Sequence, residues 1–268
     1  MSIWRAALVI VLIGASGCSS NMDWLLRYRA QKAISRQDFL SAVALFQKIV
    51  DRDHNSPAAL AAAREGATVA HLDAKNYASA VQFYKLLVLR APDAEERKSA
   101  QKFIAQIHFD NLHDYDQAVV EYEKLLKLKH RPEEAFRYRL NLAKSQFNLN
   151  NIDQALNELD VILSQSHSPD ELYEARVLKA NTEVTAKKLP EAAVQWQAIL
   201  KDFPEKAAKE NVALNLAVCY EEMREFGKAI EVLEKMREGY AQPEFLDLRI
   251  QRLRERQENL PGAKGLRR

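Results

Sequence analysis

The sequence predicts an all-α fold, a solenoid of six helix pairs with a C-terminal capping helix. Three observations lead to this fold class. Glycine and proline are scarce, with 7 and 8 among 268 residues, and few segments alternate polar and apolar residues as strands do. A short pattern centred on an alanine recurs six times. A proline follows each copy of the pattern, at the point where its helix should end.

The repeated pattern places apolar residues at −3, 0, +4 and +7 around a central alanine, as in Tyr115, Ala118, Tyr122 and Leu125. These positions share one face of a helix, and the small alanine allows a second helix to approach closely. Successive central alanines are 38, 38, 37, 37 and 37 residues apart, and so constant a period is typical of a solenoid. The six are Ala42, Ala80, Ala118, Ala155, Ala192 and Ala229.

Each repeat is predicted to hold a helix A, a tight turn and a helix B that carries the alanine. Proline cannot continue a helix but suits the first turn of the next one. The prolines are Pro57, Pro92, Pro132, Pro169, Pro204 and Pro243. The predicted A helices are 23–35, 57–73, 94–111, 133–149, 170–186 and 206–223. The predicted B helices are 38–52, 76–90, 114–129, 152–165, 189–202 and 226–239.

The segment after the sixth repeat predicts the polar helix that closes a solenoid. Phe245, Leu248 or Arg249, and Leu253 fall at helical spacing on one side, and charged residues cover the rest. The solenoid with its cap is therefore expected to span residues 23–259, followed by a disordered basic tail at 260–268.

The N-terminus has the pattern of a secretory signal, with a positive start, the apolar run 6–13 and then small residues. The run is far shorter than the roughly 20 residues that span a bilayer. The segment "ASGC" resembles the lipobox of bacterial lipoproteins, with alanine at 15 where leucine is usual. The resemblance implies a signal peptide at 1–17, a lipid on Cys18 and a short linker at 18–22. The alternative is a plain signal peptide and an incidental cysteine.

The repeats resemble the tetratricopeptide-repeat (TPR) family over about residues 23–240. Helix B matches best, and the small helix A residue expected twelve before the anchor is present as Ala30, Ala143, Ala180 and Ala217. Thr68 and Gln106 stand there in the other two copies, and the period exceeds the familiar 34. The resemblance implies a right-handed solenoid whose A helices line a concave groove.

The groove that the resemblance implies would be lined by apolar helix A residues fifteen or eight before the anchors. The candidate binding residues are Phe103, Leu140, Phe147, Val177, Val184 and Leu214. Because the usual buried positions are polar in two repeats, at Arg139 and Gln146 and at Arg176 and Glu183, we favour core positions for most of the candidates. A groove remains the other interpretation.

No constellation for catalysis is recognised, and no catalytic residue, cofactor or metal ligand is predicted. His108 and His113 are five apart, a poor spacing for one metal, and are expected in a solvated turn. There is no glycine-rich phosphate loop. The sequence has 39 basic and 37 acidic residues, and removal of residues 1–17 would delete one of the basic ones, Arg5. The net charge is then close to zero, which gives no support to nucleic-acid binding. Cys219 is expected in the core rather than as a reactive thiol.

The sequence therefore favours a protein-binding scaffold, not an enzyme, for assembly of an envelope complex. Its partners would be other envelope proteins or peptides, and its lipid on Cys18 would reach the membrane. Serine after that cysteine, rather than aspartate, favours the periplasmic face of the outer membrane. Trp24 either contacts that membrane or packs in the first repeat. The alternative function is a permanent subunit of an envelope machine, of the barrel-insertion or secretin/pilus type, or a coordinator of cell-wall synthesis and division.

Overall fold

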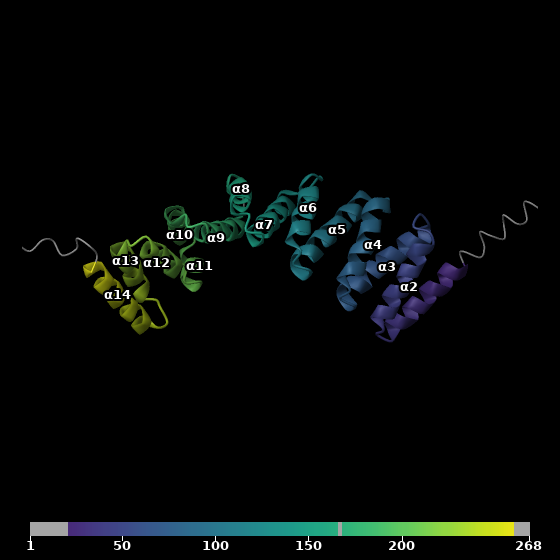
Figure 1. Cartoon of the computed structure of the whole chain (residues 1–268), viewed down its shortest axis with the longest axis horizontal. Helices are drawn as coiled ribbons and strands as arrows, with labels where there is room; N and C mark the ends of the chain where they lie inside the picture. The colour runs from purple at the N-terminus through teal and green to yellow at the C-terminus, as the bar shows by residue number, and fades with distance from the viewer. Residues whose placement is uncertain (1–20, 166–167, 260–268) are drawn as a thin grey trace, which may run out of the picture. The chain divides into compact units, whose positions relative to one another are not determined.

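The computed structural model describes residues 21–165 and 168–259, and these residues form helices joined by turns, with no strand among them. The predicted all-α, TPR-like fold is confirmed. The chain divides into two compact units, one up to His130 and one from Arg131. Figure 1 shows that the helices follow one another in chain order within each unit. The predicted signal peptide, Cys18 and the basic tail lie outside the described residues.

The N-terminal unit consists of three helix pairs, two of which include a short π-helical turn. Its first helix covers residues 21–35. The following elements are α2 (Phe39–Arg52), α3 (Pro57–Thr68), η1 (Val69–Asp73), α4 (Tyr77–Arg90), α5 (Ala94–Gln106), η2 (Ile107–Asn111) and α6 (Tyr115–Leu126). η1 and η2 directly extend α3 and α5, so each pair has the predicted A–turn–B order.

The C-terminal unit continues the same order of A and B helices and ends with the capping helix. Its elements are α7 (Pro132–Asn148), α8 (Ile152–Leu163), α9 (Pro169–Thr185), α10 (Leu189–Asp202), α11 (Pro204–Lys209), α12 (Val212–Glu222), α13 (Phe226–Arg237) and α14 (Pro243–Glu258). Five of the six repeat prolines are the first residue of a helix, as their fixed φ favours. The exception is Pro92, which lies two residues before α5.

The central alanines lie in the core of both units. All six are fully buried, and the residue four positions later is buried in every copy. In the N-terminal unit the core includes Ala42, Phe46 and Ala80. The prediction that alanine marks the contact between helices is therefore confirmed, because a larger side chain would separate the helices there.

Each A–B turn contains one residue other than glycine in the left-handed conformation, five positions before the central alanine. The φ values lie between 50° and 61°. These residues are Gln37, Lys75, His113, Asn150, Lys187 and Arg224. They repeat with the period of the alanines, so the turn geometry recurs even though its sequence does not.

The π-helical turns account for the two 38-residue repeats. A π-helical turn accommodates one extra residue in a helix. In the 37-residue repeats the fully buried small residue of helix A is twelve before the anchor, as in Ala143 and Ala180. In the repeats that contain η1 and η2 it is thirteen before, at Ala67 and Ala105. The small residue is therefore present in all six copies, and the apparent mismatch at Thr68 and Gln106 is a shift of one position.

The sixth helix A differs from the prediction, because the expected helix 206–223 is two helices. α11 ends at Lys209 and α12 begins at Val212, with Asn211 left-handed between them at φ 55° and ψ 36°. The capping helix also differs. Its buried stripe is Leu246, Ile250 and Leu253, whereas Phe245 and Leu248 are exposed. Only the buried stripe has the i, i+4, i+7 spacing that faces a neighbouring helix throughout.

Candidate binding groove

The predicted groove residues differ in how far they are buried. Leu140 is only 1% exposed and belongs to a core cluster with Phe136, Ala143 and Leu159. It is therefore a core residue and not a groove residue. Val177, Val184 and Leu214 are half-buried and pack against the neighbouring core cluster. These three side chains therefore lie at the edge of that core cluster.

Phe103 and Phe147 differ from these valines and leucines. Phe103 is 37% exposed, and its ring stacks on Tyr84 with 5.0 Å between centroids. Because η2 adds a residue, Phe103 lies one helical position away from the site that Leu140 occupies in its own repeat. Phe147 is half-buried near the end of α7. Because of this extra residue, positions counted back from the central alanine are not equivalent in the repeats with and without a π-helical turn. Phe103 and Leu140 therefore differ in burial although both lie fifteen residues before their alanine.

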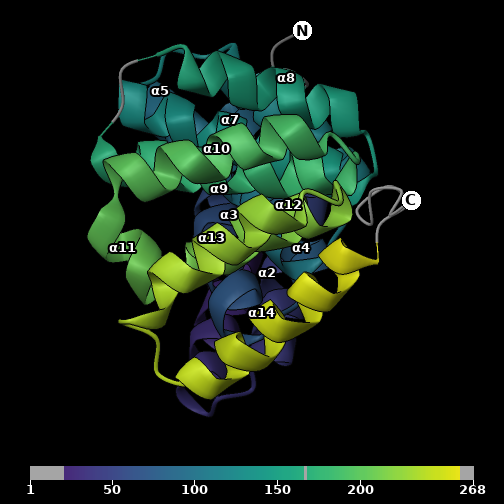
Figure 2. The ribbon, with the colours of Figure 1, turned by 90° about the vertical axis from the view of Figure 1, so that its left-hand side faces the viewer.

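A groove does exist in the C-terminal unit, and Asn211, at the break between α11 and α12, is one of the residues that line it. The residue before the break, Glu210, accepts a hydrogen bond of 2.6 Å from the hydroxyl of Tyr173 on α9. Burial and the adjacent Glu210 carboxylate raise the pKa of Tyr173, so this hydroxyl keeps its proton and remains a donor. Figure 2 shows α11 turned away from α12. The bond from Tyr173 thus ties α9 to the residue next to the break.

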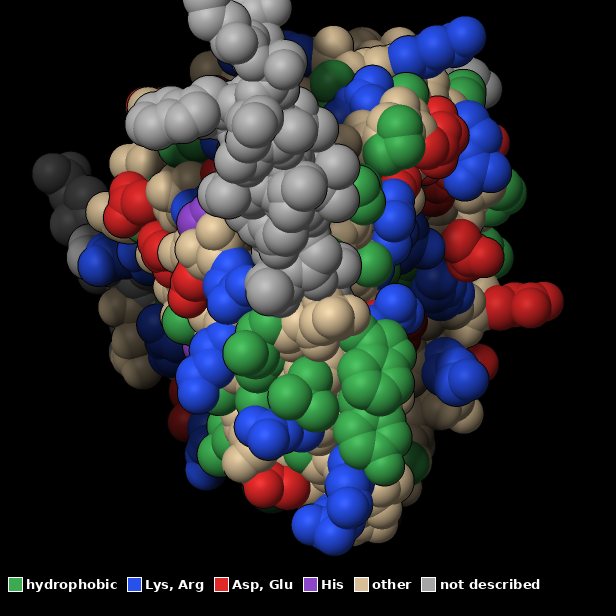
Figure 3. Space-filling view, turned by 90° about the vertical axis from the view of Figure 1, so that its right-hand side faces the viewer, with side chains coloured by type: hydrophobic (Ala, Val, Ile, Leu, Met, Phe, Trp, Pro, Cys, Tyr) green, Lys and Arg blue, Asp and Glu red, His purple; other side chains and the backbone are tan. Residues whose placement is uncertain are grey.

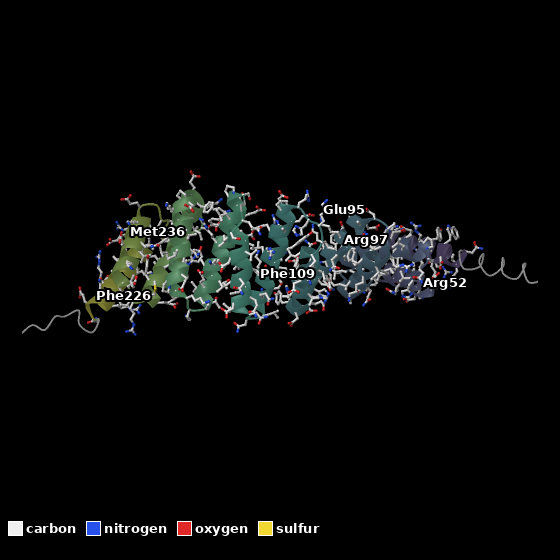
Figure 4. The ribbon with its side chains drawn as sticks, turned by 90° about the horizontal axis from the view of Figure 1, so that it is seen from above. Arg52, Glu95, Arg97, Phe109, Phe226 and Met236 are labelled. Atoms are coloured by element: carbon white, nitrogen blue, oxygen red, sulfur yellow. The ribbon has the colours of Figure 1, made fainter. Side chains whose placement is uncertain are left out.

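The groove lies between α10 and α13, with α11 and α12 forming its floor and one end, and has a volume of about 830 Å³. Apolar side chains from α10, α12 and α13 line it, among them Leu200, Leu216, Val232 and Met236. Met236, labelled in Figure 4, stands at the C-terminal end of α13. A volume of this size is typical of ligand sites in proteins, roughly 300–1,000 Å³.

Polar groups of the groove are placed at its edges. Gln197 donates a hydrogen bond of 2.6 Å to the Tyr220 hydroxyl, which orients that ring. Lys228 lies 5.5 Å from the centre of the Tyr220 ring. Three lysines line the groove against one acid, Glu231, which pairs with Lys235 at 2.6 Å. The third lysine is Lys201. Lys228 in turn pairs with Glu225 at 2.7 Å, so of these three lysines only Lys201 has no acidic partner among the described residues. The lining is therefore apolar, with one uncompensated positive charge at Lys201.

The sequence pattern did not predict this groove, because residues 206–223 have the apolar spacing of one continuous helix. The available signal was Asn211, since asparagine adopts the left-handed conformation more readily than most residues. Of the predicted site residues, only Leu214 lies on α12, and it is not among the residues that line the groove. A helical period alone does not reveal a break when apolar residues continue on both sides of it.

The histidines and Cys219 do not form a second site among the described residues. Among the described residues no group of histidine, cysteine and acidic side chains is arranged to hold a metal ion. His108 is buried, which corrects the expected solvated turn, and its Nδ1 lies 3.1 Å from Asp114, the residue that caps α6. Cys219 is fully buried as predicted, and burial raises the pKa of its thiol. No described helix is long and apolar enough to cross a membrane.

Comparison with known protein families and with curated proteins finds no match. Among solved structures the chain is similar to YrrB, a TPR protein with an unusual peptide-binding site, with a TM-score of 0.52 and 18% identity over 77% of this chain and 97% of that one. It is also similar to PilW, a widely conserved type IV pilus biogenesis factor, with a TM-score of 0.50 and 14% identity over 84% and 97%.

The apo form of RapI matches with a TM-score of 0.57 and 12% identity over 89% of this chain and 72% of that one. Identities this low establish the fold and leave the function open. The described helices therefore have the fold of TPR proteins, as the resemblance of the repeats predicted.

Proposed function

We propose that this chain is a lipid-anchored scaffold on the periplasmic face of the outer membrane, where it binds a partner during assembly of an envelope complex. The observation that carries the binding role is the groove between α10 and α13, which is apolar inside and lined by lysines. The anchor rests on the lipobox-like segment that ends at Cys18, and the choice of membrane rests on Ser19. Binding, not catalysis, is the proposed activity.

The chemistry of the groove indicates the kind of partner it would take. Apolar side chains at helical spacing would enter between Leu200 and Met236, and an acidic side chain beside them would face Lys201. An amphipathic helix with an acidic residue on its polar edge meets both requirements. The likeness to YrrB, described as having a peptide-binding site, supports a peptide segment as the ligand.

A permanent subunit of an envelope machine is the second candidate. Its support is the outward face of α14, where Phe245 is 49% and Leu248 58% exposed on a helix expected to be polar. Exposed apolar side chains at the end of a repeat array favour a lasting contact. The likeness to PilW, a pilus biogenesis factor, is compatible with either role.

The anchor is tested by mass spectrometry of the mature N-terminus and by membrane fractionation. The expected result is a lipid on Cys18 and sedimentation with the outer membrane. Cys18→Ser should abolish the lipid, and Ser19→Asp should move the protein to the inner membrane. A mature N-terminus without lipid on Cys18 would reject the anchor.

The groove is tested with a photo-crosslinking amino acid at position 236 in the full chain, in its native host. Lys201→Glu should reduce crosslinking to the partner severalfold, because it removes an attractive charge at the groove edge. Lys209→Glu is the matched control, since Lys209 is exposed on α11, does not line the groove and gives the same change in net charge. Equal crosslinking in both variants would reject the groove as the binding site.

The same crosslinked complex distinguishes the two candidate functions. A scaffold should exchange its partner when unlabelled protein is added, and Phe245→Ser with Leu248→Ser should leave crosslinking at position 236 unchanged. A permanent subunit should keep its partner during exchange, and the α14 substitutions should release the chain from its complex. Slow exchange together with release would favour the permanent subunit.

A further inference from the structure

The first helix exposes two aromatic side chains on its outward face. Trp24 is 67% and Tyr28 54% exposed, and their rings stack with centroids 5.8 Å apart and planes 12° from parallel. One helical turn separates them, so both point the same way. Of the two alternatives for Trp24, packing in the first repeat is therefore wrong.

The opposite face of this helix is fixed against the core of the N-terminal unit. Leu26 and Ala30 are buried there, in the cluster that contains Ala42. Gln31 donates a hydrogen bond to Glu65 on α3, and Arg27 pairs with the same carboxylate. These contacts hold the helix in one rotation about its axis and leave Trp24 and Tyr28 on the surface.

The first helix pair carries more net positive charge, for its length, than the chain as a whole. Residues 21–52 contain six basic and three acidic residues, whereas the full sequence has a net charge of only +2. Two of the basic residues are paired, Arg52 with Asp23 at 2.9 Å and Arg27 with Glu65. Arg29, Lys32 and Arg36 are exposed. Figure 3, which faces this end of the unit, shows hydrophobic side chains bordered by lysine and arginine.

We propose that this surface of the first helix, with Trp24 and Tyr28 at its centre, docks on an anionic phospholipid surface. Tryptophan and tyrosine favour the boundary between headgroups and acyl chains, where the ring is apolar and its N–H or O–H remains hydrated. Exposed basic residues beside them are attracted to anionic headgroups. The occupant is therefore a membrane, which matches both the apolar and the positive character of the surface.

The position of the surface relative to the proposed anchor supports the same occupant, and this step rests on the proposed function. The first helix begins at residue 21, three residues after Cys18. Three residues extend by at most about 10 Å. A lipid on Cys18 would thus hold Trp24 within reach of the headgroups. Because the anchor already restricts the motion of the chain, docking would cost little additional entropy.

The test uses the purified full chain in vesicles of phosphatidylcholine with and without phosphatidylglycerol. The fluorescence of Trp24 is taken as the difference between wild type and Trp24→Phe, because Trp196 is buried and contributes to both equally. Docking predicts emission at shorter wavelength, quenching by brominated acyl chains and protection from iodide in vesicles with phosphatidylglycerol. Arg29→Glu with Lys32→Glu should weaken docking at least fivefold, about the effect of one basic residue near such a surface.

A matched control reverses charge elsewhere on the same unit, with Lys85→Glu and Lys102→Glu, two exposed lysines outside the first pair. This control should leave Trp24 protected. If a chain that floats with the vesicles keeps Trp24 open to iodide, the docking inference is rejected and the anchor stands. If mass spectrometry shows Cys18 without lipid, the anchor is rejected, and binding of this unlipidated chain to phosphatidylglycerol vesicles then decides the docking inference alone. A shift and a protection of Trp24 that are equal in both vesicle types would show that the surface does not select anionic lipid, which also rejects the inference.

Discussion

The backbone N–H of Asn76 donates a hydrogen bond to the carbonyl oxygen of Ala70, six residues earlier and 2.8 Å away. The corresponding bond in the third repeat, from Asp114 to His108, also spans six residues, whereas the bond from Asn151 to Gln146 spans five. The longer span coincides with η1 and η2. One residue has thus been accommodated inside helix A, and the turn and helix B that follow keep their geometry.

Deleting Leu72 should convert the second repeat to the 37-residue form with little loss of stability. Leu72 lies in η1 and is 64% exposed, so its removal takes no side chain from the core. The helix can close as a regular α-helix and bring Ala67 twelve residues before Ala80. Urea unfolding monitored by circular dichroism should give a free energy of unfolding close to that of wild type.

The control is deletion of Thr185, an exposed residue at the end of α9 in a repeat without a π-helical turn. This deletion leaves Ala180 one residue too close to Ala192 and should cost roughly 2–5 kcal/mol, the range of core truncations. Equal losses in both variants would contradict the role assigned to the π-helical turns.

The sequence was sufficient for the repeats and insufficient for their local departures. The alanines were identified because a small residue among large apolar ones has a packing consequence at every copy. From the sequence alone, a small residue shifted by one position to Ala67 cannot be told from a substitution of the small residue by Thr68. Both interpretations fit a helix, and they differ only in whether one backbone hydrogen bond spans five or six residues. The break at Asn211 lies beside a tertiary contact, from Tyr173 to Glu210, which no helical period contains. Residues on both sides of the break line the groove, so the groove was missed together with the break.

Lys187→Gly should stabilise the protein by about 0.5–1 kcal/mol. Lys187 has φ 60°, a left-handed conformation that glycine adopts without the strain of a Cβ atom. Asn150→Gly, at φ 61° in the preceding turn, should gain less because asparagine tolerates this conformation better than lysine. Urea unfolding of the two variants and wild type measures both effects. A loss of stability in Lys187→Gly would mean that the lysine side chain, not its backbone, sets the turn.

Ala155→Leu should destabilise the C-terminal unit by about 1–3 kcal/mol. Ala155 is fully buried on α8, which packs against α7 and α9, and three extra carbon atoms must displace one of these helices. Gln154→Leu is the control, because Gln154 is exposed on the same helix. Hydrogen exchange should rise mainly in α7, α8 and α9, since repeats contact only their neighbours. Unchanged exchange in these helices would contradict the packing role of the alanine.

Glu183→Gln should stabilise the protein at neutral pH. Glu183 is 4% exposed and its Oε2 has no hydrogen-bond partner in the structure. Burial, with the nearby Glu191 and Asp160, raises the pKa of its carboxyl above the ordinary 4.5, although Lys179 at 3.7 Å opposes the shift. Wild type therefore loses stability as pH rises from 4.5 through the folded pKa, whereas glutamine, which does not ionise, does not.

Glu121→Gln should show the opposite dependence on pH and is the matched comparison. Glu121 is also buried, but Gln101, Gln117 and Lys124 donate hydrogen bonds to it. Although burial opposes ionisation, these donors lower its pKa, so its stabilising contribution is present above 4.5 and is lost as pH falls through the folded pKa. Glu121→Gln should cost roughly 1–3 kcal/mol at neutral pH and progressively less on acidification. The free energies of unfolding are measured at neutral pH and below 4.5. Relative to wild type at neutral pH, Glu183→Gln should be more stable and Glu121→Gln less stable, and both differences should shrink below 4.5. A change in the same direction for both variants would show that burial alone, and not the hydrogen-bond donors, sets both pKa values.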